Sequence, residues 1–311
     1  MLYKKSITDK IKLRLNLYLG LLKQRKEIKN LYNSFDEAVK KDFRSILKFN
    51  LIRSLKPYFL FEGGKREYNF YSSKDKVLVF DSYIFKPAEI KQNFQKNSFS
   101  EIIQEYSILI EEILITKAYE DEEVKVEPKD IVLDCGANIG IFSVYAAKKA
   151  KMVYAFEPGK NEIASLYENK TLNNCNNIKI IPKAVLDNSK SARLVLLGVA
   201  SSYLVSEEKK ENKEVINREN ILNIETISID EFVEKEGLEK VDFIKMDIEG
   251  SEGEALIGAE ETLKKFRPKL AISIYHKFSD FYKLPLLIKK INPEYKIKVR
   301  NKKGTLMAYA I

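Results

Sequence analysis

Residues 131–140 read Ile-Val-Leu-Asp-Cys-Gly-Ala-Asn-Ile-Gly, and this stretch decides the predicted fold. An apolar run ends at Asp134, and Gly136 and Gly140 follow before a second apolar run at 141–147. We interpret this pattern as a buried strand, a tight turn and a helix, because glycine permits positive φ angles and close backbone approach. The free N–H groups that open the helix then face any ligand above the strand end.

The glycine spacing departs from the dinucleotide-binding pattern G-x-G-x-x-G. Counted from Gly136, the second and third glycines of that pattern are replaced by Asn138 and Ile141, which weighs against a pyrophosphate cofactor. A second predicted strand ends just before Glu157, 23 positions after Asp134. An acid about 20 residues on, at the end of the second strand, can bind both hydroxyls of a ribose.

Four motifs occur in a fixed order along the second half of the chain. They are LDCGANIG at 133–140, AFEP at 155–158, KMDIEGSE at 245–252 and RPKLAISIYHK at 267–277. Together they make the chain, from roughly residue 118 to its last residue, resemble the FkbM family of S-adenosylmethionine-dependent class I methyltransferases.

This resemblance implies a Rossmann-like α/β fold, in which a mostly parallel sheet carries helices on both faces and ends in an antiparallel hairpin. It also implies S-adenosylmethionine as the cofactor. The carboxylate of Asp134 would accept from the cofactor's amino group, directly or through water, and the glycines would make room for its methionine part. The expected cofactor-binding residues are Asp134, Gly136, Asn138, Gly140, Glu157 and Ala184.

We predict two regions, an N-terminal region at 1–125 and a cofactor-binding domain at 126–311. The first contains basic helices, a small antiparallel sheet near 58–86 and a connecting helical segment. From residue 126, strand and helix patterns alternate, which indicates parallel βαβ units. The expected strands are 131–134, 152–156, 178–181, 192–197, 224–229, 241–246 and 269–275, with a closing hairpin at 295–299 and 305–311.

Two local features complete the expected domain. Asp230 is predicted to cap a helix at 231–237. Gly258 interrupts a helix that starts near Ser251 or Glu252, for no reason visible in the sequence.

The positive charge of the chain is concentrated in residues 1–56, which carry 15 basic and 5 acidic residues of a chain whose net charge is +9. The remainder is nearly neutral, which argues against a domain that binds nucleic acid. Residues 1–56 are either a helical extension packed on the core or a basic surface that contacts an anionic membrane or acceptor.

The expected localisation follows from the cysteines and the apolar runs. Two cysteines do not form a disulfide framework, and no apolar run reaches the roughly 20 residues that span a bilayer. We therefore expect a cytoplasmic protein, with a peripheral contact at the inner membrane as an alternative for the basic residues. The sequence does not indicate an oligomeric state.

Polar residues end the predicted core strands, where open α/β sheets bind their ligands. If the methyl acceptor is an alcohol, a base must take its proton, and the candidates are Asp247, Glu249 and His276. Each has an alternative role: Asp247 could bind the cofactor or a metal, Glu249 could cap a helix, and His276 could be purely structural. Related catechol-type enzymes hold Mg²⁺ through an acid at the position of Asp247 and further acids after the fifth strand. Because His276 and Lys277 stand there instead, the metal remains unknown.

The resemblance implies an O-methyltransferase whose acceptor is a hydroxyl of a sugar in a bacterial surface glycan or of a secondary metabolite. The alternatives are N-methylation of a sugar amine or a protein, and a non-catalytic scaffold that retains the fold. Nucleic acid is not an expected partner, because Asp247-Ile248-Glu249-Gly250 stands where amino-methylating enzymes carry Asn/Asp-Pro-Pro-Tyr.

Overall fold

The computed structural model describes residues 71–72, 77–87, 106–196, 202–205, 221–277, 279–302 and 305–311. The predicted basic helices of residues 1–56, the first strands of the small N-terminal sheet, and a charged stretch at 207–219 lie outside these ranges. Within the ranges, no helix has both the length and the apolar character that crossing a bilayer requires.

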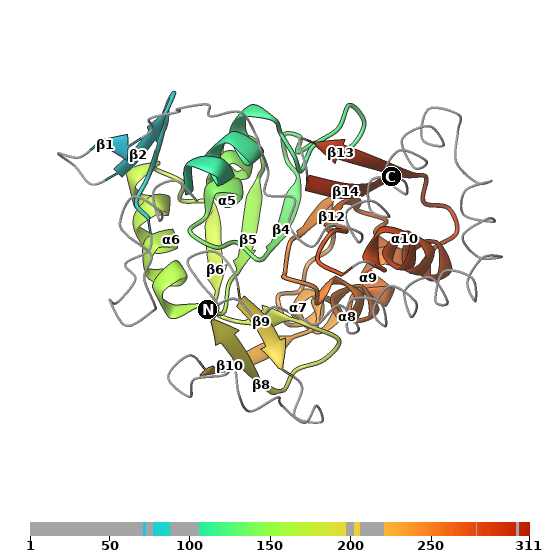
Figure 1. Cartoon of the computed structure of the whole chain (residues 1–311). Helices are drawn as coiled ribbons and strands as arrows, with labels where there is room; N and C mark the ends of the chain where they lie inside the picture. The colour runs from blue at the N-terminus through green and yellow to red at the C-terminus, as the bar shows by residue number, and fades with distance from the viewer. Residues whose placement is uncertain are drawn as a thin grey trace, which may run out of the picture.

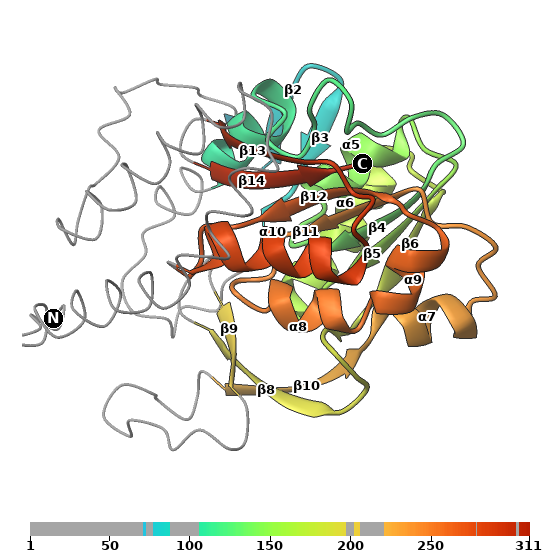
Figure 2. The same cartoon turned by 90° about the vertical axis from the view of Figure 1, so that its right-hand side faces the viewer.

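A seven-stranded sheet forms the centre of the described chain, in the order β13-β14-β12-β11-β4-β5-β6 (Figures 1 and 2). The strands are β4 (Ile131–Cys135), β5 (Met152–Phe156), β6 (Ile178–Ile181), β11 (Phe243–Met246), β12 (Lys269–Ser273), β13 (Ile297–Lys302) and β14 (Thr305–Ala310). The five strands from β12 to β6 pair in parallel, whereas β14 pairs antiparallel with both β12 and β13. The predicted α/β fold with a C-terminal antiparallel hairpin is confirmed.

Helices cover both faces of this sheet, as Figure 2 shows. They are η1 (Glu111–Ile115, a π-helical turn), α5 (Ile141–Ala147), α6 (Lys160–Leu172), α7 (Ile229–Lys235), α8 (Glu252–Ile257), α9 (Glu260–Lys265) and α10 (Asp280–Ile291). Alternate strand residues point to opposite faces. Leu133 and Phe156 therefore pack in the core that α7 to α10 cover, while Val132 and Val153 pack in the core under η1, α5 and α6.

Two smaller sheets flank the central one. The first joins β1 (Tyr71–Ser72), β2 (Val77–Phe80) and β3 (Tyr83–Phe85), and it is attached to α6 where Asn173 accepts from the backbone N–H of Ile84 at 3.0 Å. The second has the order β7-β10-β8-β9 and projects below the central sheet in Figure 2. Its strands are β7 (Ala184–Val185), β8 (Ser191–Leu196), β9 (Ser202–Val205) and β10 (Ile221–Ile227).

The predicted cap of α7 is wrong. The side chain of Ser228 caps this helix by accepting from the N–H of Glu231, and the helix begins at Ile229, two residues before the predicted start. Asp230 instead accepts from the N–H groups of Glu261 and Thr262, at 3.0 and 2.8 Å, in the first turn of α9. Asp230 therefore caps the first turn of a different helix, 30 residues further along the chain.

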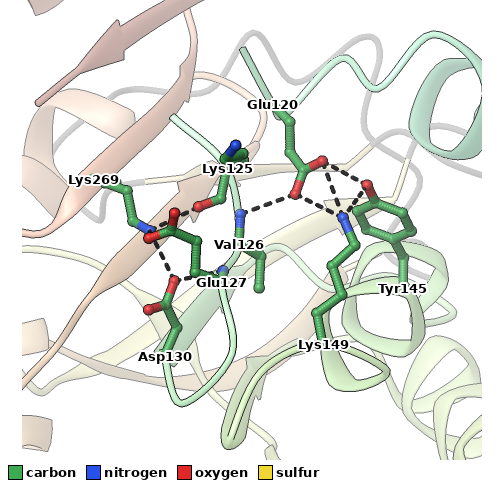
Figure 3. Close-up of polar contacts among 8 residues, drawn as sticks. All are labelled: Glu120, Lys125, Val126, Glu127, Asp130, Tyr145, Lys149 and Lys269. Atoms are coloured by element: carbon green, nitrogen blue, oxygen red, sulfur yellow. Dashed lines mark hydrogen bonds and ion pairs between the residues drawn. The ribbon is translucent and has the colours of Figure 1, made fainter. Parts of the chain in front are cut away.

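The segment that leads into β4 is fixed by polar contacts along its length (Figure 3). The buried carboxylate of Glu120 accepts from the N–H of Val126 and from the hydroxyl of Tyr145 on α5, at 2.9 and 2.5 Å. Lys269, at the start of β12, donates to Asp130 at 2.9 Å. The predicted boundary between residues 125 and 126 stays a prediction, but the chain on its N-terminal side is attached to the sheet.

The structure explains Gly258, which separates α8 from α9. A Cβ at this position would lie 2.2 Å from the carbonyl oxygen of Leu186 and 2.9 Å from the Cα of Asp187. We expect Gly258→Ala to lower the free energy of unfolding by about 1–3 kcal/mol, because the added methyl group forces backbone to move. Denaturant unfolding measures this change.

Gly253→Ala is the matched control, because a Cβ there would meet only the Leu284 side chain at 3.7 Å. Alanine inside a helix is favoured over glycine by about 0.5–1 kcal/mol, so this variant should unfold at the same or a higher denaturant concentration. Equal stability of the two variants would contradict the packing explanation.

Candidate active site

The turn after β4 has the backbone that its glycines predict. Gly136 and Gly140 have φ angles of 81° and 88°, and Asn138 between them has a φ of 51°. A Cβ on Gly136 would lie 2.0 Å from the carbonyl oxygen of Asp247, and one on Gly140 would lie 2.1 Å from Leu166 Cδ1. A Cβ at Gly136 would therefore clash with the backbone at the end of β11, and one at Gly140 would clash with a side chain of α6.

Asp134 is fully buried and its carboxylate is engaged within the protein. One oxygen accepts from Ser143 Oγ of α5 at 2.6 Å, and the other lies 3.0 Å from the ammonium of Lys245. Lys245 stands opposite Asp134 in the β4–β11 pair and also donates to the carbonyl of Gly136 at 2.6 Å. The contact of Asp134 with a cofactor stays a prediction, and its observed partners are Ser143 and the buried Lys245.

Lys245 was missed by the sequence analysis, although a lysine inside the apolar strand Phe243–Met246 is unusual. Its side chain is only 4% exposed. Burial by itself lowers the pKa of an ammonium, but the carboxylates of Asp134 and Asp247 outweigh this effect and raise the pKa of Lys245. Lys245 therefore stays charged beneath the glycine turn.

Glu157 connects the glycine turn to the start of α6. Its two oxygens accept from the backbone N–H groups of Asn138 and Gly159, both at 2.8 Å. Burial, followed by repulsion from Glu162, raises the pKa of Glu157 to about 7, although the two backbone hydrogen bonds oppose the rise. The structure thus brings two predicted cofactor residues into direct contact. Ala184 lies in β7 opposite Thr226, and its predicted role stays untested.

The three predicted catalytic residues lie together at the carboxyl ends of β11 and β12. His276 Nε2 is 3.3 Å from Asp247 Oδ1 and 3.6 Å from Glu249 Oε2. The other ring nitrogen, Nδ1, is 3.1 Å from Oε1 of Glu252, an acid that is 1% exposed. That same oxygen accepts from the backbone N–H of Ile248 at 2.9 Å, so the turn after β11 fixes the acid behind the imidazole.

Two tyrosines that the sequence analysis did not assign also reach Asp247. Tyr119 donates its hydroxyl to Oδ2 at 2.5 Å, and Tyr275 donates to Oδ1 at 3.3 Å. Tyr275 directly precedes His276, so its position was within the recognised motif. Tyr119 lies 128 residues before Asp247, and nothing in the local sequence links the two.

The three residues of the cluster differ in their pKa values and therefore in their protonation states. Burial opposes charge on His276, but Glu252, Asp247 and Glu249 raise its pKa to about 9. Burial also opposes ionisation of Asp247, but His276 and Lys245 outweigh it and lower the pKa of this acid. Burial raises the pKa of Glu249 to about 7, against the attraction of His276. At neutral pH the cluster therefore contains an imidazolium, an ionised Asp247 and a Glu249 near its midpoint.

The donor atoms do not fit a magnesium ion. Asp247, Glu252 and His276 bring one ligand atom each within 4.8 Å of one another in the described part of the chain. However, the imidazole lies between the two carboxylates, with Nε2 facing Asp247 and Nδ1 facing Glu252. Magnesium prefers oxygen ligands in octahedral geometry. The arrangement is that of an imidazolium held by two acids.

Comparison with known proteins identifies relatives of the chain. The model of the family described as "Methyltransferase FkbM domain" matches residues 134–295, just over half of the chain. The chain is 30% identical to the hexuronic acid methyltransferase AglP of Haloferax volcanii over 140 residues, which are 45% of this chain and 54% of that protein. It is 26% identical to the 2-O-methyltransferase NoeI of Sinorhizobium fredii over 168 residues, 50% of this chain and 65% of that protein. The chain thus spans about half to two thirds of these relatives.

One solved structure shares the fold over most of the chain. The crystal structure of methyltransferase FkbM from Methylobacillus flagellatus KT aligns with a TM-score of 0.55 at 18% identity, and the alignment covers 94% of this chain and 60% of that one. The likeness confirms the predicted class I methyltransferase fold.

Because Glu157 titrates near pH 7, we expect the affinity for S-adenosylhomocysteine to depend on pH. The ionised carboxylate is the stronger acceptor for ribose hydroxyls. Binding should therefore lower the pKa of Glu157 and release a proton, and affinity should fall by up to about tenfold per pH unit below 7. Calorimetric titration at several pH values measures this.

The variant Glu157→Gln should bind more weakly at pH 8 and lose the pH dependence. Glu168→Gln, which changes an exposed acid on the same helix α6, is the matched control and should keep it. A wild-type affinity that is constant from pH 6 to 8 would contradict the assignment of Glu157.

Proposed function

The chain belongs to the FkbM family of methyltransferases, and on this basis we propose that it transfers the methyl group of S-adenosylmethionine to a hydroxyl oxygen of a sugar or a related small molecule. The observation that carries the proposal is the cluster of Asp247, Glu249 and His276 beside the glycine turn. The two are adjacent because β11 and β4 are neighbours, and the N–H of Asp247 donates to the carbonyl of Cys135 at 3.1 Å.

The proposed step is a direct displacement at the methyl carbon. The acceptor oxygen attacks this carbon, the carbon–sulfur bond breaks, and S-adenosylhomocysteine leaves with the electron pair of that bond. The hydroxyl proton must pass to a base as the new bond forms. Much of the acceleration comes from holding the oxygen, the methyl group and the sulfur in line.

Among the three candidates, Glu249 is the best proton acceptor. The pKa of Asp247 is lowered, and its oxygens already receive the hydroxyls of two tyrosines. His276 is protonated at neutral pH because its pKa is about 9, so it has no free lone pair. The side chain of Glu249 is 38% exposed, and its pKa of about 7 matches the optimum for a general base.

The backbone of Glu249 supports a functional role. Its φ angle is 56°, in the left-handed region that residues with a Cβ rarely adopt. Strained residues of this kind cluster at active sites, where the surrounding structure holds them. In our proposal His276 and Asp247 then form a charged frame that keeps Glu249 close to the acceptor.

The acceptor class rests on the relatives. Two of them are the hexuronic acid methyltransferase and the 2-O-methyltransferase described above, and a third is the 31-O-demethyl-FK506 methyltransferase FkbM of Streptomyces tacrolimicus, 23% identical over 181 residues. We propose a sugar hydroxyl of a bacterial surface glycan as the acceptor, with a secondary metabolite as the second choice. N-methylation of an amine that is already neutral would leave Glu249 dispensable, and a non-catalytic scaffold would bind the cofactor without turnover.

Glu249→Gln tests the proposed base. We expect the rate of methyl transfer to a sugar acceptor to fall by about 10²–10⁴-fold, because the proton has no acceptor. The affinity for S-adenosylhomocysteine should change by less than about twofold. In the wild type, the rate should rise with pH through about 7, where Glu249 ionises. Radiolabelled methyl transfer to a panel of bacterial sugars measures both effects.

The matched control is Glu254→Gln, which changes an exposed acid on the neighbouring helix α8. It should keep the wild-type rate and pH profile. Full activity of the Glu249 variant with the same rising limb would rule out Glu249 as the base.

We also propose a peripheral contact between residues 1–56 and an anionic membrane surface, supported by their 15 basic and 5 acidic residues. Each basic residue near such a surface contributes about 1 kcal/mol of salt-sensitive attraction. The full chain should float with anionic but not with zwitterionic liposomes. Replacing the lysines of this segment by glutamine should abolish flotation, and unchanged flotation would contradict the contact.

A further inference from the structure

Tyr119 is a residue of the site that lies outside the part of the chain matched by the family model, which begins at Asp134. Its side chain is buried at 2% exposure, and its hydroxyl donates to Asp247 Oδ2 at 2.5 Å. We propose that Tyr119 is a positioning residue, which holds the Asp247 carboxylate so that its other oxygen faces His276. The inference deepens the proposed function and rests on it, because it assigns a role within the same site.

The two oxygens of the Asp247 carboxylate contact different partners. Oδ2 receives the Tyr119 hydroxyl, whereas Oδ1 faces His276 Nε2 at 3.3 Å and receives the Tyr275 hydroxyl at 3.3 Å. In this proposal the hydrogen bond at Oδ2, together with one from the side chain of Ser273 to the same carboxylate, keeps the carboxylate from rotating away from the imidazolium. The geometry of the charged frame therefore depends on a donor at Oδ2.

Packing on two sides holds the ring of Tyr119. Phe142 of α5 contacts it edge-on, with ring centroids 5.4 Å apart. The ammonium of Lys245 lies 5.0 Å from the ring centroid, within the range of a cation–π contact. Tyr119 thus lies between the lysine beneath the glycine turn and the acid of the proposed catalytic cluster, and it contacts both.

The backbone around Tyr119 is fixed as well. The carbonyl of Ala118 accepts from the hydroxyl of Tyr309 on β14. On the other side, Glu120 binds Val126, Tyr145 and Lys149, as Figure 3 shows. These contacts on both neighbouring residues fix the direction in which the Tyr119 side chain leaves the chain.

The single histidine of the chain gives a direct test, because its ring signal in an NMR spectrum needs no assignment. The charged and titratable groups around His276 are Asp247, Glu249, Glu252, Asp280, Tyr275 and the neighbouring Lys277. Tyr119→Phe removes the hydroxyl but retains the ring that packs on Phe142. Without the donor at Oδ2, the Asp247 carboxylate can rotate away from the imidazolium, which should then lose its proton at a lower pH.

We therefore expect the midpoint of the His276 titration to fall by about half a pH unit in Tyr119→Phe, in the full chain without a histidine tag. The matched control is Tyr295→Phe, which removes another buried hydroxyl, bonded to the carbonyl of Pro268 at the opposite end of β12. Thermal unfolding of both variants checks that the fold is intact. The control should keep the wild-type midpoint.

An unchanged or higher midpoint in Tyr119→Phe, or an equal fall in Tyr295→Phe, would overturn the inference. The titration needs no methyl acceptor, so it can be read even if no sugar is methylated, an outcome that counts against the proposed function alone. Where an acceptor is found, Tyr119→Phe should lower kcat by about tenfold and leave the affinity for S-adenosylhomocysteine within about twofold.

Discussion

The ammonium of Lys245, which is buried beneath the glycine turn, is the group on which the site depends. It neutralises Asp134 across the β4–β11 pair and holds the carbonyl of Gly136, so the glycine turn has one defined position. Burying both charges costs several kcal/mol per ion, and removing one partner of such a pair costs about 3–5 kcal/mol. The buried ion pair therefore need not make the fold more stable than an apolar pair would. Its role is to fix the geometry of the glycine turn.

The same ammonium connects the two halves of the site. Together with His276, it lowers the pKa of Asp247. The ionised Asp247 in turn stabilises the imidazolium of His276, and the other side of the imidazole ring lies against Glu252. Charges of alternating sign thus run from the end of β4 to the end of β12. Glu249 lies at the exposed edge of this series, with a pKa near neutrality. Partial burial raises the pKa of Glu249 to about 7, and the attraction of His276 opposes this rise.

The segment before the family-matched region contributes to the site as well as to the core. Tyr119 reaches Asp247, and the neighbouring Glu120 is bound to α5. The described part of the N-terminal region is therefore in contact with the cofactor-binding domain. The predicted division of the chain near residue 125 stays a prediction, and Tyr119 on one side of it contacts Asp247 on the other.

The sequence by itself determined the order of the elements and the residues at the ends of the core strands. Alternating strand and helix patterns imply a parallel sheet, and parallel strands bring Asp134, Asp247 and His276 to one edge. These are local patterns, and each is visible within a short window. Only the tertiary structure decided the partners: Asp230 caps α9 instead of α7, and Gly258 is small because the backbone near Leu186 lies against it.

The same distinction applies inside the site. The buried partner of Asp134, the acid behind His276 and the tyrosine that reaches Asp247 come from other strands, helices and loops. Their pairing depends on strand order and register, which no single window of sequence contains. The pKa values follow from burial and from those pairings. The sequence could therefore name the candidate residues, whereas the protonation state of each was decided by the fold.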